Sequence, residues 1–221
     1  MKQILISIIF LSASIGSPCF GNVGKYQQLY SEMELEGIVD YVAFEQAMTG
    51  YDKLVKKSTN QDILTLIDYS KPSTEKRFYV LDIKHKKILF NTHVSHGKKS
   101  GENYATSFSN KKGSNKSSLG FFRTDHTYEG RNGYSLILNG LEKGVNDQAR
   151  ARSIVIHGAA YCNPDSIPFD GRLGRSLGCP ALPETICEEI IDTIKEGTLL
   201  YIYANNISYK TKNKAIVNRS R

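Results

Sequence analysis

The spacing of hydrophobic residues changes near residue 60 and separates a helical segment from a β-rich one. Between residues 22 and 58, apolar side chains recur every three or four positions, which is the period of an amphipathic helix. They are Phe44, Ala47, Met48, Tyr51, Leu54 and Val55. Asp40 and Glu45 suit the start of this helix, since acidic side chains are stabilised at its positive end. We expect the segment to pack across the main domain rather than to act as a partner-binding arm.

From residue 61 onward, short β-type runs dominate the pattern. They cover residues 63–67, 77–83, 87–94, 133–138, 154–157 and 198–203. Residues 84–86 form a short polar link, which predicts a hairpin. Two helices are also expected, one through Ala151 capped by Asn146, and one that starts at Pro183 and ends near Gly197. Strands outnumber helices, so one mainly β domain with peripheral helices is predicted.

The two ends of the chain differ in composition from the middle. Lys2 and the apolar run from Ile4 to Ile15 are typical of a secretory signal over residues 1–21. This run is shorter than the ~20 apolar residues that span a membrane, so export is favoured over a membrane anchor. Residues 206–221 hold five basic residues and no acid, which predicts a solvated tail. The alternative is contact between this tail and an anionic wall polymer or membrane surface, while export argues against nucleic acid.

Candidate chemistry is concentrated in residues 153–182. A short apolar run ends on His157, and a loop rich in Gly and Pro closes on Ser176-Leu177-Gly178-Cys179. A thiol becomes a strong nucleophile when an imidazole takes its proton. Gly178 lets the backbone approach a reacting carbonyl, and the N–H groups of Gly178 and Cys179 are candidates for binding an oxyanion. The alternative is that a Cys and a His this far apart are unrelated to catalysis.

The cysteine count supports a reactive thiol. Cys19 would leave with the signal, and the remaining three are Cys162, Cys179 and Cys187. An odd number in an exported protein indicates a free reactive thiol or an intermolecular bridge. If Cys179 is the nucleophile, the other two are free to pair in an oxidising compartment. Their spacings match no ordinary zinc site, and no metal or cofactor is expected.

The motif resembles the signature of L,D-transpeptidases, the cysteine enzymes that cross-link bacterial peptidoglycan. His157-Gly158 and Ser176-Leu177-Gly178-Cys179 occupy the places of the family's His-Gly and Ser/Thr-His-Gly-Cys elements. Leu177 stands where the common motif has a second His. A divergent branch with Gly-Arg-Ser-x-Gly-Cys-Pro-Ala-Leu matches residues 174–182 better.

The resemblance implies a β-sandwich of the L,D-transpeptidase type over residues 61–205, preceded by the helical segment 22–60 and followed by the tail 206–221. It also implies an exported enzyme of the periplasm or cell envelope that acts on peptidoglycan stem peptides. Cys179 would form a thioester, His157 would act as the base, and the Gly158 carbonyl would orient the imidazole. The residues expected near the substrate are Ser176, Arg175, Leu177 and His96.

Several alternatives stay open on the sequence alone. Arg175 has a second interpretation as a loop-fixing salt bridge, and His96 has one as a loop histidine bonded to the backbone. The same Cys/His pair would serve an L,D-carboxypeptidase or another wall hydrolase, and a non-catalytic wall-binding module is a further alternative. A papain-like peptidase is disfavoured, because that class places Cys before His in the chain whereas His157 precedes Cys179.

Overall fold

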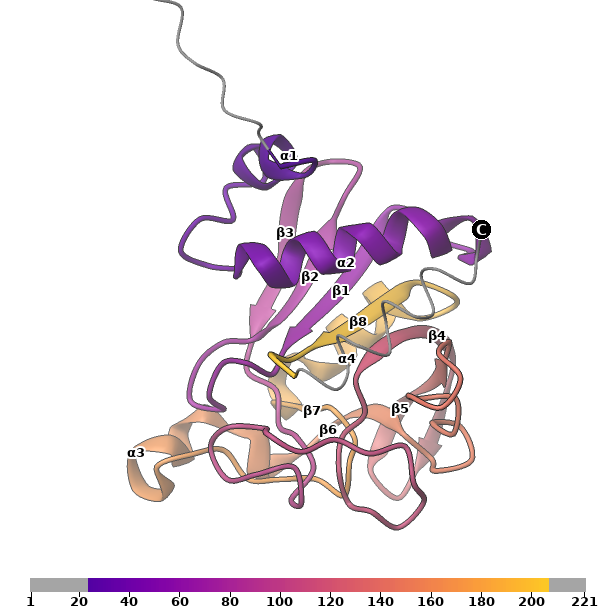
Figure 1. Cartoon of the computed structure of the whole chain (residues 1–221). Helices are drawn as coiled ribbons and strands as arrows, with labels where there is room; N and C mark the ends of the chain where they lie inside the picture. The colour runs from indigo at the N-terminus through magenta and orange to yellow at the C-terminus, as the bar shows by residue number, and fades with distance from the viewer. Residues whose placement is uncertain (1–23, 207–221) are drawn as a thin grey trace, which may run out of the picture.

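The computed structural model describes residues 24–206, and the predicted signal 1–21 and all but the first residue of the basic tail lie outside this range. Eight strands of the described chain form one sheet in the order β3-β2-β1-β8-β4-β5-β6-β7 (Figure 1). The strands are β1 Ile63–Asp68, β2 Phe78–Asp82, β3 Lys87–Thr92, β4 Gly120–Gly130, β5 Gly133–Gly140, β6 Val155–Gly158, β7 Ala181–Leu182 and β8 Leu199–Tyr203. The helices are α1 Gln27–Glu32, α2 Tyr41–Leu54, η1 Val55–Lys57, η2 Ala160–Cys162, η3 Pro164–Ser166, α3 Ile167–Asp170 and α4 Glu184–Ile194.

The mainly β fold with peripheral helices is confirmed, and the expected sandwich takes the form of one curled sheet. Its edge strands are β3 and β7, and the chain just after β3 returns to β7. There, Ser95 N–H donates to the Ala181 carbonyl at 2.9 Å, and Gly97 forms a second bridge with Ser176. The sheet is therefore nearly closed, and its seam lies beside the predicted Ser176–Cys179 motif.

Strands β1, β2 and β8 are buried at every position and form the centre of the hydrophobic core. Helix α2 packs on β1 and β8, and Figure 1 shows it lying across that half of the sheet. Its buried side chains are Ala43, Phe44, Ala47, Met48 and Tyr51, all but Ala43 belonging to the predicted apolar stripe. Asp40 Oδ1 accepts from the Ala43 N–H at 2.9 Å, so the predicted acidic start of this helix is an N-cap. The division at residue 60 itself stays a prediction.

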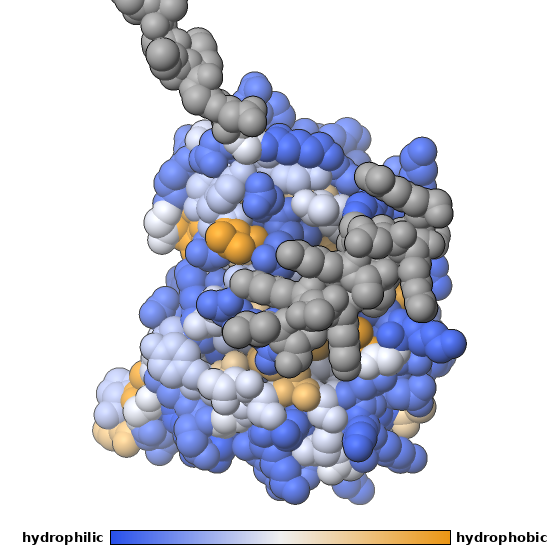
Figure 2. Space-filling view, in the orientation of Figure 1, coloured by the Kyte–Doolittle hydropathy of each residue, from blue (hydrophilic) through white to orange (hydrophobic). Residues whose placement is uncertain are grey.

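Helix α4 packs against β5 and β6 with Cys187, Ile190, Ile191 and Ile194 buried. The sequence predicts the three isoleucines on this face together with Ile186, which is only partly buried. Beyond the core, apolar side chains are scattered, and Figure 2 shows a largely hydrophilic face with small apolar patches. Residues 24–206 contain no helix that is long and apolar enough to cross a membrane.

One predicted helix is wrong. The chain from Asn146 to Ala151 forms turns, and Asn146 does not cap a helix. Its buried side chain donates to the carbonyls of Leu119 and Phe121 and accepts from the Glu142 N–H, each at 2.9 Å. Leu119 and Phe121 lie far from Asn146 in the sequence, whereas Glu142 is separated from it by one turn. The Asn146 side chain therefore joins the start of β4 to the segment before β6.

Candidate active site

Strand β6 delivers His157 to the seam of the sheet. The strand is held on both sides, since His157 pairs with Ser135 of β5 and with Ala181 of β7. The imidazole Nδ1 lies 2.8 Å from the Gly158 carbonyl oxygen, so Nδ1 carries the proton and Nε2 is left as an acceptor. Burial lowers the pKa of His157, which keeps the ring neutral at neutral pH.

The Ser176–Cys179 turn is a rigid element that presents Cys179. Ser176 Oγ donates to the Cys179 carbonyl at 2.6 Å and accepts from the Gly178 N–H at 3.0 Å. Ser117 Oγ donates to the Gly178 carbonyl at 3.1 Å. Gly178 has φ +133°, and a Cβ built on it would lie 2.9 Å from the Lys116 carbonyl oxygen, so only glycine fits here. The backbone that carries the thiol is thus fixed from both sides.

The thiol of Cys179 lies against the start of β6. Cys179 Sγ is 3.6 Å from the Ser153 carbonyl oxygen, to which the thiol donates. Burial raises the pKa of this thiol, while the Val155 backbone N–H and the Arg152 charge pull the pKa down. The resting sulfur is therefore protonated and needs a base. Ala181 of β7, two residues after Cys179, pairs with His157 of β6, so the chain segment that carries the cysteine runs up to the strand that carries the histidine.

The two predicted oxyanion donors, the N–H groups of Gly178 and Cys179, have different surroundings in the structure. The Gly178 N–H donates to Ser176 Oγ, and oxyanion binding by this N–H stays a prediction. For the Cys179 N–H, no protein acceptor is recorded within residues 24–206. Oxyanion binding by the Cys179 N–H therefore stays a prediction.

His96 lies in the interior of the protein. Its ring is completely buried, with Nδ1 at 2.8 Å from Arg77 Nη2 and Nε2 at 3.3 Å from the Gly101 carbonyl oxygen. Burial, with the Arg77 charge beside it, lowers the pKa of His96 to about 4. The neutral ring bonds the core arginine to the loop backbone, and substrate contact by His96 stays a prediction.

Arg175 and Leu177 have contrasting surroundings. Arg175 Nη1 bonds to Glu102 Oε1 at 2.6 Å and to two loop carbonyls, which are the contacts of the loop-fixing alternative. Leu177 is 64% exposed beside the thiol turn. A substrate role for either residue stays a prediction.

Arg152 is a site residue that the sequence analysis missed. Its Nη1 donates to the Ser109 carbonyl and to Ser118 Oγ, both at 2.6 Å, and Nη2 donates to the Lys116 carbonyl at 2.6 Å. These acceptors belong to the loop between β3 and β4. Every recorded acceptor is a carbonyl or hydroxyl, so no acid in the described chain neutralises this cation. Nothing in the local sequence marks it, since its partners lie more than 30 residues away.

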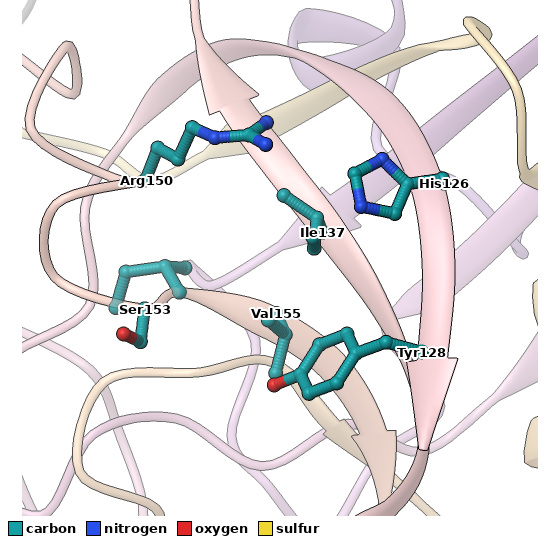
Figure 3. Close-up of a pocket in the computed structure, with 7 residues that line it drawn as sticks. His126, Tyr128, Ile137, Arg150, Ser153 and Val155 are labelled. Atoms are coloured by element: carbon teal, nitrogen blue, oxygen red, sulfur yellow. The ribbon is translucent and has the colours of Figure 1, made fainter. Parts of the chain in front are cut away.

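A cavity of about 280 Å³ lies between the β4–β5 hairpin and the chain before β6. Figure 3 shows side chains from these segments gathered around Ile137. The lining residues are His126, Tyr128, Ile137, Arg150, Ser153, Ile154 and Val155. None of them except Ser153 to Val155 belongs to the sequence motif.

Comparison with known proteins decides the family. The sequence profile of the L,D-transpeptidase catalytic domain matches residues 35–203, which is most of the chain. The chain belongs to the L,D-transpeptidase catalytic domain family. Members of this family act on peptidoglycan stem peptides and are typically enzymes of the cell envelope.

Solved structures resemble this chain at low similarity. An L,D-transpeptidase from Mycobacterium smegmatis is 15% identical, with a TM-score of 0.40, and the match covers 65% of this chain and 59% of that one. The helical cell shape determining protein Pgp2 from Campylobacter jejuni is 16% identical, with a TM-score of 0.39, over 70% of this chain and 55% of that one. The chain thus matches less than two thirds of these proteins' length. A search of curated protein sequences found no significant match.

Within this L,D-transpeptidase domain, all three described cysteines are free. Cys162 is buried and its Sγ donates to the Ala181 carbonyl at 3.0 Å. Burial raises the thiol pKa to about 11 at Cys162 and to about 12 at Cys187. No group of three or more His, Cys, Asp or Glu side chains in residues 24–206 is placed to hold a metal ion.

We expect Arg152→Ala to slow acyl transfer about 10- to 100-fold, because it removes a charge near the thiol and charge-assisted bonds worth about 1.5–3 kcal/mol each. The pKa of Cys179 should rise, and Arg152→Lys should restore part of the shift. Iodoacetamide labelling of Cys179 as a function of pH measures this directly. Arg131→Ala, in the exposed turn between β4 and β5, is the control. A labelling profile identical to wild type in Arg152→Ala contradicts the assignment.

Proposed function

We propose that this L,D-transpeptidase-family domain is an exported cysteine acyltransferase that works on peptidoglycan stem peptides through a Cys179 thioester. The observation that carries the proposal is the strand pairing of His157 with Ala181, two residues after Cys179, together with the Gly158 carbonyl that accepts from His157 Nδ1 and leaves Nε2 available. A protonated thiol beside a neutral imidazole is the resting state that general-base activation requires.

The proposed reaction has two acyl transfers. The Cys179 sulfur attacks the carbonyl between the third stem residue and the terminal D-alanine, and His157 takes the thiol proton. The C–N bond then breaks, the proton passes from His157 to the leaving amine, and a thioester remains. An amine on a second stem attacks the thioester, gives its proton to His157, and the thiol re-forms. The Gly158 carbonyl holds the imidazole orientation throughout, as a carboxylate does in a triad.

Ser176 acts in this scheme by position rather than by contact with the reacting atoms. Its hydroxyl accepts from one backbone N–H and donates to one carbonyl of the thiol turn. The Cys179 N–H is then the backbone donor closest to a developing oxyanion.

The test is a product assay with a purified tetrapeptide stem, run with and without an amine acceptor. We expect D-alanine release together with a cross-linked product when the amine is present. Release of D-alanine with a trimmed tripeptide as sole product under both conditions identifies an L,D-carboxypeptidase instead. Absence of any D-alanine release from a folded protein supports the wall-binding alternative and contradicts the proposal.

A further inference from the structure

Positive charge is concentrated in the loop between β3 and β4. Residues 24–206 contain 23 basic and 22 acidic residues, so this part of the chain is almost neutral as a whole. The loop, residues 93–119, has five lysines and a single acid, Glu102. Figure 1 shows it at the end of the molecule opposite α1 and α2. A local excess of positive charge on an otherwise neutral domain attracts a partner of the opposite charge.

The lysines of this loop are not neutralised within the described chain. Glu102 accepts instead from Arg172 Nε at 3.0 Å and from Arg175 Nη1 at 2.6 Å. Asp147 also contacts the loop, but it accepts from Asn110 Nδ2 at 2.7 Å. No recorded ion pair of residues 24–206 includes a loop lysine. The four that are exposed are Lys98, Lys99, Lys111 and Lys112, and we call their side chains the lysine surface.

The backbone beneath the lysine surface is held by hydrogen bonds. The Lys99 N–H donates to the Asn115 carbonyl at 3.0 Å, which places the run 98–100 beside the run 109–116. From the interior, Arg152 donates to two carbonyls of the second run, each at 2.6 Å. The four ammonium groups are therefore carried by a fixed backbone, and binding a partner does not require the loop to be ordered first.

The residue types of the surface indicate the chemistry of that partner. Its free cations are all lysines, which bind phosphate oxygens as compact point charges, whereas a carboxylate is matched best by an arginine fork. The neighbouring guanidinium groups of Arg172 and Arg175 are already bonded to Glu102. Both lysine runs otherwise hold only Ser, Asn and Gly. Neither run therefore has an apolar side chain to enter a lipid layer or an aromatic ring to stack on a nucleotide base.

The lysine surface adjoins the segment that carries Cys179. The Lys98 N–H donates to the Ser176 carbonyl at 2.8 Å, and Ser117 Oγ donates to the Gly178 carbonyl at 3.1 Å. A polymer bound along the loop would thus run past the edge of the thiol turn.

We propose that the lysine surface binds a phosphodiester polymer of the cell envelope and holds the domain beside it. Four ammonium groups on two adjacent runs match a chain with repeated single negative charges. This interaction surface is separate from the acyl-transfer chemistry and from the basic tail 206–221. It adds an anchoring partner to the proposed function and does not depend on it.

The test measures binding of poly(glycerol phosphate) to the full chain by calorimetry over a range of salt concentrations. The loop variant carries Lys98→Gln, Lys99→Gln, Lys111→Gln and Lys112→Gln. The control variant loses the same charge at four exposed lysines without a recorded ion pair, through Lys53→Gln, Lys56→Gln, Lys76→Gln and Lys87→Gln. We expect binding at low salt to weaken at least ~10-fold in the loop variant and to stay within about threefold in the control. The slope of log affinity against log salt should fall by about 3, since each lost contact removes ~0.7.

Four results overturn the inference, and a thermal melt of each variant confirms that the fold is intact. Absence of binding by the wild-type protein excludes the partner, and an equal loss in both variants shows that net charge alone matters. Equal affinity for poly-glutamate with the same number of charges excludes a preference for phosphate. Tighter binding of oligothymidylate, or binding confined to phosphatidylglycerol vesicles, assigns the surface to nucleic acid or to a membrane instead. None of these measurements uses turnover, so each failure leaves the proposed acyl transfer to its own test.

Discussion

Cys179→Ala is expected to reduce turnover on the order of 10⁶-fold, the cost of removing the nucleophile from a unit in which the residues act together. The reason is that the covalent route needs the sulfur, and nothing else in the seam replaces it. Folding should be almost unaffected, since the thiol contacts only backbone groups of the described chain, the Ser153 carbonyl at 3.6 Å and the Val155 N–H. D-alanine release from a tetrapeptide stem, with a thermal melt on the same sample, measures both effects.

The other two cysteines provide matched controls for this substitution. Cys162 and Cys187 are buried, and their thiol pKa values near 11 and 12 leave both sulfurs protonated at neutral pH. Cys162→Ala and Cys187→Ala should therefore retain turnover within about twofold and lose roughly 1 kcal/mol of unfolding free energy. Turnover that survives in Cys179→Ala but is lost in either control moves the nucleophile to a different residue.

His157→Ala is expected to lower the rate by about 10²–10⁴-fold at neutral pH, the range for a positioned general base. The pH dependence of the rate distinguishes loss of the general base from a general loss of activity. In the wild-type protein the lowered pKa of His157 places the acid limb below pH 6.5, so activity falls only when the pH drops through that lower value. In His157→Ala the thiol must ionise by itself, and its raised pKa makes the residual rate climb with pH through and beyond 9.

The control for this substitution is a histidine remote from the seam. His85 lies in the exposed link between β2 and β3, where its Nδ1 bonds to Asp82 Oδ2. His85→Ala should leave the rate and the pH profile unchanged. An acid limb that persists unaltered in His157→Ala rules this histidine out as the titrating base.

The periodic parts of the fold were predictable because their signals are local. The apolar spacing of α2 and α4 and the runs of β1, β2, β3, β5, β6 and β8 all follow from burial on one or two faces. The hairpin at residues 84–86 needed only its turn chemistry. Strand β7 has two residues, too short for any period, and it forms because Ser95 and His157 flank it in space. Asn146 was misassigned because its partners come from the start of β4, which no local pattern shows.

The candidate site also contains residues that local sequence predicts and residues whose contacts are long-range. His157 at the end of a strand and Cys179 after a small-residue turn are adjacent features of the sequence, and the structure brings both to one seam. The contacts of Arg152 depend on acceptors more than 30 residues away, in the loop between β3 and β4. His96 looked like a loop residue, but the closure of the sheet buries it against Arg77. Long-range contacts of this kind leave no signature in a single sequence.

The most direct test of the account is the position and mass of the acyl adduct. The protein is incubated briefly with a tetrapeptide stem, quenched in acid and digested, and each cysteine-containing peptide is weighed. The account predicts a single adduct on the peptide that contains Cys179, with the added mass of the stem lacking its terminal alanine. An adduct on Cys162 or Cys187, or D-alanine release with no adduct on any cysteine in the protein and equal release by Cys179→Ala, would contradict it.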